Sequence, residues 1–204
     1  MDKEKEKNLV IDSDFTEYKK VFLEENSKVN LISKNDEKLL YEKHIYDSLA
    51  IKFTDRLKDG QDLLDIGCGG GFPSVPIAIE YPNINVYALD SIRKKINAIN
   101  NIKRALWLNN LTTICDRVEN LNGQKFDIIT TRAVANLAVV AEYALPLLKR
   151  TGYFVAYKSR KLFEEIENAK KIIKLYDAKI VDIIDYTLPL EEVFERYLIV
   201  IGYK

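Results

Sequence analysis

The chain of 204 residues contains little of several features that mark particular classes of protein. Its two cysteines, Cys68 and Cys115, are too few for a framework of disulfide bonds or for a zinc site built from cysteines. No stretch comes near the ~20 apolar residues that a membrane-spanning helix needs, and the alternating charges of residues 1–7 are not those of a signal peptide. We therefore expect a cytoplasmic protein, in a reducing compartment and without a membrane partner.

An excess of charge of either sign is also lacking, because 31 Lys and Arg residues balance 31 Asp and Glu residues. This balance excludes a protein that is held to nucleic acid by its overall positive charge, so an RNA partner would have to meet a local basic patch. With 47% hydrophobic residues, the chain has the composition of a folded protein. Its length suits one large domain, or one domain with an extension.

The hydrophobic pattern changes close to residue 60. Before this point the periodicity is helical. The first predicted helix ends at Asn26-Ser27, and a second begins at Asp36 and runs through His44 and Asp47. We predict that residues 1–59 form an N-terminal helical extension, which packs on a domain formed by residues 60–204.

From residue 61 onward, predicted strands alternate with helical stretches. The strands are expected at 62–66, 85–89, 111–115, 126–130, 153–157, 178–185 and 196–202. The clearest helix between them follows Ser91, which is the expected N-cap residue. Only a loop separates the last two strands, so they predict a terminal antiparallel hairpin. The pattern predicts an α/β fold with a mostly parallel, Rossmann-like, seven-stranded sheet, as in class I methyltransferases, and leaves the strand order open.

The first predicted strand ends in a glycine cluster, Asp65-Ile66-Gly67-Cys68-Gly69-Gly70-Gly71-Phe72. Glycines let a ligand approach the backbone closely, and the helix that follows offers unpaired N–H groups. The dinucleotide fingerprint G-x-G-x-x-G would need a glycine where Phe72 stands, which disfavours a dehydrogenase. The spacing is instead D-x-G-x-G-x-G, with glycines at Gly67, Gly69 and Gly71.

Carboxylates follow three successive strands. Asp65 suits a cationic amino group, Asp90 can accept both hydroxyls of a ribose, and Asp116 and Glu119 follow the third strand, where an adenine would lie. The glycines alone could form a tight turn without a ligand, and Asp90 alone could be an N-cap residue. Together the glycines and acids predict S-adenosyl-L-methionine as the cofactor.

Further segments of the sequence follow the pattern of one family. They are Asn30-Leu31-Ile32, His44-Ile45-Tyr46-Asp47-Ser48-Leu49, the glycine cluster through Pro76, Leu89-Asp90-Ser91, Arg117-Val118-Glu119, Thr131-Arg132-Ala133-Val134-Ala135 and Leu145-Pro146-Leu147-Leu148. In these segments the chain resembles the bacterial 16S ribosomal RNA (guanine-N7) methyltransferase G family over nearly its whole length. The glycine cluster is common to class I methyltransferases, whereas the segments at 44–49 and 131–135 are specific. Departures occur at Ile32, Lys43, Ser74 and Tyr157-Lys158-Ser159.

The resemblance implies a class I S-adenosylmethionine-dependent methyltransferase domain that methylates N7 of a guanine in the decoding-region loop of 16S ribosomal RNA. It also implies that Gly67, Phe72, Val118, Glu119 and Arg132 line the cofactor site, with Asp90 at the ribose. The expected partner is 16S rRNA or the small ribosomal subunit, with neither DNA nor a membrane involved. The protein is expected to be a monomer, and no metal ligands are predicted.

Guanine N7 carries a lone pair and no proton, so its methylation requires positioning and desolvation rather than a general base. We expect two cations to do the positioning. Arg132 would contact the cofactor or steer the guanine, and Lys158 would contact an RNA phosphate. The alternatives are a surface arginine and a solvated lysine. His44 and Asp47 lie on one helix face, either against the cofactor or as a buried pair that joins the extension to the domain.

Two other functions stay open at this point. The chain could be a class I methyltransferase for a small molecule or a protein, or a noncatalytic cofactor-binding module associated with the ribosome. The segments at 44–49 and 131–135 favour the rRNA enzyme over the first. The presence of Asp65, the three glycines and Asp90 favours an active enzyme over the second.

Overall fold

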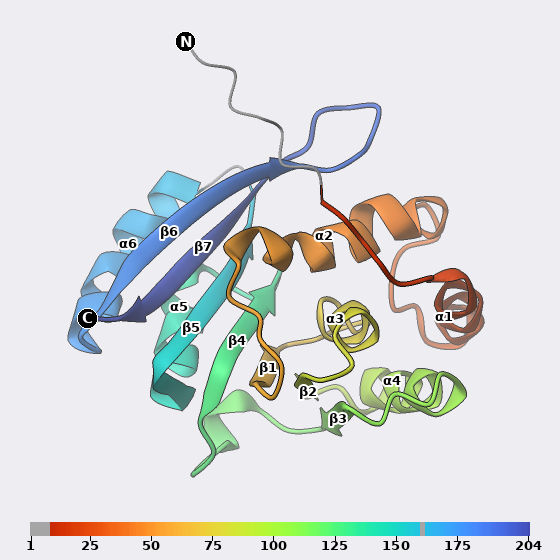
Figure 1. Ribbon diagram of the computed structural model, residues 1–204, viewed down its shortest axis with the longest axis horizontal. Coiled ribbons are helices and arrows are strands. Elements are labelled where there is room, and N and C mark those ends of the chain that lie inside the picture. The colour runs from red at the N-terminus through yellow and green to blue at the C-terminus, as the bar shows by residue number, and fades with distance from the viewer. Residues whose placement is uncertain (1–8, 160–161) are drawn as a thin grey trace.

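The computed structural model describes residues 9–159 and 162–204 (Figure 1). Within these residues, seven strands form one sheet in the order β3-β2-β1-β4-β5-β7-β6. The strands are β1 (Asp62–Ile66), β2 (Asn85–Leu89), β3 (Leu111–Ile114), β4 (Phe126–Arg132), β5 (Leu148–Lys158), β6 (Ala178–Thr187) and β7 (Glu195–Tyr203). β1 to β5 are parallel, and β7 runs antiparallel to both β5 and β6. The predicted α/β fold with its terminal hairpin is confirmed.

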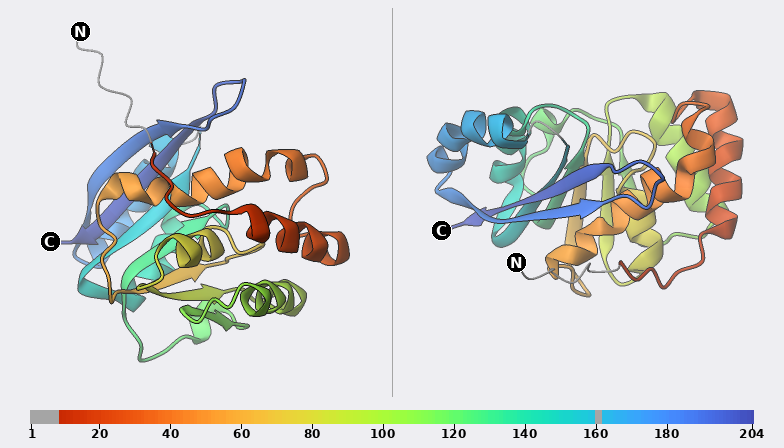
Figure 2. Two further views of the ribbon diagram at one scale, coloured as in Figure 1. Left: turned by 45° about the vertical axis from the view of Figure 1, so that its right-hand side comes forward. Right: turned by 90° about the horizontal axis from the view of Figure 1, so that it is seen from above.

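Two helical layers cover the sheet. Seen from above in Figure 2, α5 (Leu137–Ala144) and α6 (Leu162–Leu175) lie on one side of the strands. The other side carries α1 (Thr16–Val29), α3 (Ser74–Glu80) and α4 (Arg93–Ala105). Neighbouring residues of a strand point to opposite faces, so Leu63 belongs to the core under α3 while Leu64 belongs to the core under α5. Burial on both faces explains why the strands are nearly continuous apolar runs.

The strand predicted at 153–157 begins earlier, at Leu148. No strand is predicted for residues 149–152. In the structure the ammonium of Lys149 lies 2.7 Å from the carboxylate of Asp127 on the neighbouring strand β4. Residues 149–152 have no register partner on β4, because the pairing passes from Leu148–Phe126 to Tyr153–Ile128. The ion pair ties this irregular part of β5 to β4.

The N-terminal segment is helical, but two expectations about it are wrong. α1 continues through Asn26-Ser27 to Val29, because the buried Asn26 has tertiary partners. Its side chain accepts from the N–H of Ile32 (2.8 Å) and donates to Glu37 (2.7 Å). The second helix is not regular: residues 36–54 form a 3-10 turn, a π-helix (Leu40–Ile45), the short α2 (Tyr46–Leu49) and a further 3-10 turn (Ala50–Thr54).

The N-terminal segment shares one hydrophobic core with the sheet. The ring of Phe22 from α1 lies 5.2 Å from that of Phe72 after β1, and both belong to the same buried cluster. Glu25 of α1 also accepts from Asn101 of α4 at 2.9 Å. This shared core is compatible with the predicted boundary at residue 59, which stays a prediction. None of the described helices combines the length and apolar character needed to cross a lipid bilayer.

If the extension and the domain form one folding unit, weakening their contact should destabilise the whole protein. Phe22→Ala should lower the free energy of unfolding by about 3–5 kcal/mol, with a single transition in urea followed by both fluorescence and circular dichroism. Phe163→Ala is the matched control, because Phe163 is 78% exposed and its loss should cost little. Two separate transitions would contradict the shared core.

Candidate active site

A cavity of about 450 Å³ lies beyond the carboxyl ends of β1, β2 and β4. β1 is the point where the strand order reverses, since β2 and β4 pair with it on opposite sides. Such a switch point is the usual ligand site of a parallel α/β sheet. The first cavity is lined by Leu31, Ile32, Asp36, His44, Gly67, Cys68, Gly69, Gly70, Phe72, Asp90, Ser91, Lys95, Arg132, Ala133 and Val134.

The glycine turn forms the floor of the first cavity, and glycine is required there for two reasons. Gly67 has φ +69°, and a Cβ at this position would lie 2.5 Å from a methyl carbon of Val134. Gly69 also has a positive φ, of +57°, a conformation that other residues rarely adopt. Gly71 does not line the cavity, since a Cβ there would meet Val75 of α3 at 2.6 Å. Gly71 therefore allows the turn to pack closely against α3.

Asp90 directly follows β2 and has its carboxylate at the cavity. Oδ2 accepts from the N–H of Gly69 (2.9 Å) and Oδ1 from the N–H of Ile92 (2.8 Å). Ser91 was predicted to be the N-cap residue of α4, and this is wrong. The N-cap residue is Ile92, whose N–H donates to the side chain of Asp90. Each carboxylate oxygen keeps capacity for another donor, as ribose hydroxyls would require.

Asp65 lies beneath the glycine turn and not among the residues that line the first cavity. Its side chain is 0% exposed, and it accepts from the N–H of Ser74 (3.2 Å) and the hydroxyl of Thr130 (3.1 Å). Burial raises the pKa of Asp65 to about 7, against the effect of the hydrogen bonds from Ser74. In this position the carboxyl group joins the turn to α3, and its predicted contact with an amino group remains a prediction.

Val118 and Glu119 lie in a 3-10 turn (Val118–Asn120) after β3. Neither residue belongs to the lining of the first cavity. Their position beyond the carboxyl end of β3 is where the sequence places an adenine, but the structure does not test that contact.

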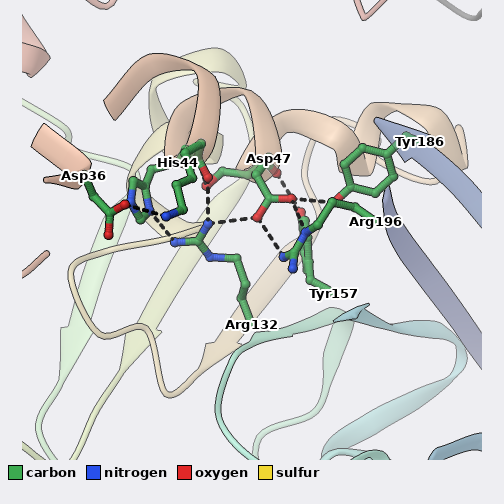
Figure 3. Close-up of polar contacts among 9 residues, drawn as sticks. Asp36, His44, Asp47, Arg132, Tyr157, Tyr186 and Arg196 are labelled. Carbon is green, nitrogen blue, oxygen red and sulfur yellow. Dashed lines mark hydrogen bonds and ion pairs between the residues drawn. The ribbon is translucent and has the colours of Figure 1, made fainter. Parts of the chain in front are cut away.

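Arg132 ends β4 and connects the cavity to the N-terminal segment (Figure 3). Nη1 donates to Oδ2 of Asp47 at 2.9 Å, and Nη2 lies 3.0 Å from Nδ1 of His44. The guanidinium carbon also lies 5.1 Å from the centre of the Phe72 ring, within the range of a cation–π contact. Arg132 is therefore no surface residue, and its three contacts fix its orientation.

Asp47 is buried at the centre of this network (Figure 3). Besides Arg132, it accepts from Arg196 (Nε 3.0 Å, Nη2 2.9 Å) and from the hydroxyl of Tyr186 (2.6 Å). Burial would raise the pKa of Asp47, but the two guanidinium groups outweigh it and hold the pKa below its usual value. No local motif in the sequence marks Arg196 and Tyr186, which lie on β7 and β6.

His44 is neutral in this setting. Burial and, next, the charge of Arg132 lower the pKa of His44 to about 4. A guanidinium group can only donate, so Nδ1 accepts from Arg132 and the ring proton lies on Nε2. This Nε2 is buried and has no hydrogen-bond partner among the residues described. His44 and Asp47 thus both join the extension to the domain, and His44 also lines the cavity.

Lys158 does not lie at the rim as a free cation. It is only 9% exposed, and Nζ lies 2.8 Å from the carbonyl oxygen of Ala135 and 2.6 Å from Glu165. Glu165 in turn accepts from the N–H of Leu137 at 2.8 Å. This ion pair holds the loop that follows Arg132, where Ala133 has φ +58°. The placement does not fit the predicted phosphate contact and indicates a role in holding the loop.

A second cavity of about 580 Å³ adjoins the first. Its lining comes from the N-terminal segment, the ends of β4 and β5, and the β6–β7 hairpin: Lys43, His44, Asp47, Arg132, Ala133, Ser159, Leu188, Phe194, Glu195 and Arg196. His44, Arg132 and Ala133 line both cavities. No local pattern in the sequence predicts this second cavity, because its walls come from segments far apart in the chain.

The raised pKa of Asp65 predicts a dependence of stability on pH. A carboxyl group with a folded pKa of about 7, against 3.8 ordinarily, contributes stability below pH 4 and loses it as the pH rises through 7. The free energy of unfolding of the wild type, minus that of Asp65→Asn, should therefore fall between pH 4 and pH 7 and stay level above pH 8. Urea denaturation at stepped pH measures this, with the exposed Asp116→Asn as control. A constant difference would refute the prediction.

Comparisons with known proteins agree with this geometry. The family model described as rRNA small subunit methyltransferase G matches residues 11–188. A "Ribosomal RNA small subunit methyltransferase G" from Staphylococcus saprophyticus is 41% identical over 191 residues, which cover 92% of this chain and 80% of the relative. The protein of that name from Bacillus licheniformis is 42% identical over 192 residues, with the same coverage.

Solved structures support the fold alone, since their sequence identity is low. An S-adenosylmethionine-dependent methyltransferase from Clostridium acetobutylicum has a TM-score of 0.60 at 18% identity, covering 83% of this chain and 98% of that one. M. jannaschii TYW2 in complex with AdoMet has a TM-score of 0.61 at 16% identity, covering 76% and 75%. The sequence match extends over most of the chain, and the fold around the cavity is that of S-adenosylmethionine-dependent methyltransferases. The chain belongs to the rRNA small subunit methyltransferase G family.

Proposed function

We propose that the protein transfers a methyl group from S-adenosyl-L-methionine to N7 of a guanine in the decoding-region loop of 16S ribosomal RNA. The relatives named above are ribosomal RNA small subunit methyltransferases, and their family includes this chain. The observation that carries the proposal is that the glycine turn, Asp90 and Arg132 surround one cavity. We also propose that it acts as a monomer in the cytoplasm.

The residues around the first cavity fit the cofactor. The turn from Gly67 to Gly70 brings backbone to the cavity without side chains apart from that of Cys68, which is buried. Asp90 presents a carboxylate with capacity for the two ribose hydroxyls. The N–H of Gly69 already holds that carboxylate in place, so little ordering would be needed on binding.

Methyl transfer to N7 demands accurate placement more than proton chemistry. When bound, the cofactor supplies a methyl group on a sulfonium centre, from which the N7 lone pair takes it while the C–S electron pair stays with sulfur. No proton leaves N7, so no general base is required. The walls common to the two cavities would place donor and acceptor side by side, and the Arg132–Asp47 ion pair, at 2.9 Å, keeps that wall rigid.

Because the chain has no net positive charge, binding of RNA requires a local group of basic residues. The helix α4 carries such a group. The helix carries Arg93, Lys94, Lys95, Lys103 and Arg104 and no carboxylate. Lys95 lines the first cavity, so the N-terminal end of α4, which carries Lys95, lies at the candidate active site. Such a patch favours phosphate contacts that position the substrate without reading its sequence. It takes the place of Lys158 as the candidate phosphate contact.

Transfer of label from methyl-labelled S-adenosyl-L-methionine to small ribosomal subunits lacking the modification tests the proposal. We expect one methyl group for each subunit, on N7 of one guanine, located by strand scission at the labile N7-methylguanosine. Label on a pyrimidine, on ribosomal protein or nowhere would refute the proposed function. Label on a small molecule or on another protein would support the alternative class I methyltransferases instead.

Asp90 should determine the affinity for the cofactor. Asp90→Asn keeps the side-chain shape but removes the charge and one acceptor, so S-adenosyl-L-methionine should bind ~10-fold more weakly in calorimetry. Asp182→Asn is the control, because Asp182 is exposed and lies outside the lining of both cavities. An unchanged affinity in Asp90→Asn would exclude the ribose role.

A further inference from the structure

Trp107 is the single tryptophan of the chain, and its side chain lies on the surface, where the residue is 83% exposed. It directly follows Leu106, the C-cap residue of α4, and has φ +56°. Glycine or asparagine is usual at this position, because the left-handed conformation is unfavourable for other residues. Trp107 thus adds nothing to the core and is not the residue that its backbone conformation favours, so the fold does not account for it.

The ending of α4 holds Trp107 in this conformation. The N–H of Leu108 donates to the carbonyl oxygen of Lys103 (3.0 Å), and the N–H of Trp107 donates to that of Arg104 (3.4 Å). These two bonds are those of a Schellman motif, which closes a helix through a left-handed residue. The backbone beneath the indole ring is therefore fixed, and the ring projects from a rigid element.

The outer face of α4, which we define as Arg93, Lys94, Asn97 and Arg104, leads to Trp107. These four residues are exposed, whereas Ile96, Ile99 and Ile102 on the opposite face are buried in the core. The helix lies beside the edge strand β3 (Figure 1). The outer face therefore presents cations and an amide to the surroundings, and no carboxylate of its own.

The carboxylate of Glu25 on α1 contacts α4, but its charge is offset by another residue. Oε2 of Glu25 accepts from Asn101 (2.9 Å), and Oε1 lies 2.6 Å from Nζ of Lys28. Glu25 is also only 6% exposed. Arg104 donates to the neutral side chain of Asn101, so its positive charge is not consumed by an ion pair with a carboxylate.

The direction of α4 connects this surface to the candidate active site. Lys95 lines the first cavity, and with a rise of 1.5 Å per residue Trp107 lies ~18 Å farther along the helix. A small molecule in the cavity does not reach so far, whereas a strand of RNA does. Phosphates are attracted to the cations of the outer face, and an exposed aromatic ring offers a surface on which any unpaired base can stack.

We propose that Trp107 and the outer face of α4 form a second contact with the RNA substrate, remote from the methylated guanine. Phosphates lie along Arg93 and Arg104, and an unpaired base stacks on the indole ring. The proposal rests on the proposed function, because it assumes the same RNA, and adds an interaction surface to it. It also explains how a chain with no net charge binds a large anionic substrate through one local surface.

Trp107→Gly separates a binding role from a structural one, because the two predict opposite effects. Glycine suits the left-handed conformation, so the midpoint of thermal denaturation should rise by ~2 °C. The KM for small ribosomal subunits lacking the modification should nevertheless rise ~10-fold. The kcat and the affinity for S-adenosyl-L-methionine should not change. Trp107→Phe keeps a ring and should restore part of the lost affinity for the subunit.

Leu175→Ala is the matched control. Leu175 is 76% exposed and ends α6 on the other side of the sheet, so its loss should leave the KM for small subunits unchanged. Arg104→Gln tests the phosphate contact, and should make the KM for small subunits less dependent on salt concentration.

Crosslinking identifies the class of partner. A photoreactive phenylalanine that carries a diazirine, placed at position 107 of the full chain and irradiated with the same small subunits, should form an adduct with a nucleotide of 16S rRNA. An adduct with a ribosomal protein would replace RNA by a protein partner, and an adduct with a second copy of the chain would indicate self-association. Either result, or the absence of any adduct, would overturn the proposal.

The kinetic measurements can contradict the proposal independently. An unchanged KM in Trp107→Gly would remove the stacking contact. A lower midpoint of thermal denaturation, together with a weaker affinity for the cofactor, would assign Trp107 to the fold. Failure of the proposed function is seen separately, because the wild type would then not methylate the guanine in unmodified subunits, while crosslinking reports the contact whether or not a methyl group is transferred.

Discussion

The buried carboxylate of Asp47 is the contact on which the arrangement of the site depends. It receives four hydrogen bonds, from Arg132, Arg196 and Tyr186. These partners belong to β4, β7 and β6, so one side chain of α2 joins the N-terminal segment to the centre and the edge of the sheet. A buried charge is stable only when it is fully paired, and the site is therefore defined only when all three parts are folded together. Arg132 lines both cavities, and its ion pair with Asp47 fixes the wall that the two cavities share.

The loop after β4 is held in place by a second set of contacts. Ala133 is held at φ +58°, a conformation that costs energy in a residue other than glycine. Lys158 and Glu165 bind the backbone of the loop at Ala135 and Leu137, and Val134 packs against Gly67. The strain is thus maintained by partners on β5, α6 and the glycine turn. The loop lines both cavities, and its rigidity keeps their separation fixed.

The sequence was most informative where the physical cause is local. The apolar runs of β1 and β2 and the glycine spacing are local patterns, and both strands have their predicted bounds. The predicted end of the first helix at Asn26 was wrong, because the side chain of Asn26 forms hydrogen bonds with Ile32 and Glu37. No local sequence rule reveals these bonds. The buried positions of Asp65 and Lys158 were missed for the same reason. Arg196 is 149 positions from Asp47, and only the closed sheet brings them together.

Charge balance at the site has a direct chemical consequence. Among the described residues that line the two cavities, four cations face four carboxylates: Lys43, Lys95, Arg132 and Arg196 against Asp36, Asp47, Asp90 and Glu195. Methylation of N7 creates no net charge, because one positive charge passes from the sulfonium to the guanine ring. Three cations line the second cavity, and Asp47 and Glu195 offset two of them, which lessens the repulsion that the arriving positive charge meets. The equal numbers of acidic and basic residues in the whole chain are thus repeated around the two cavities taken together, and this balance lowers the electrostatic cost of moving a positive charge from the first cavity to the second.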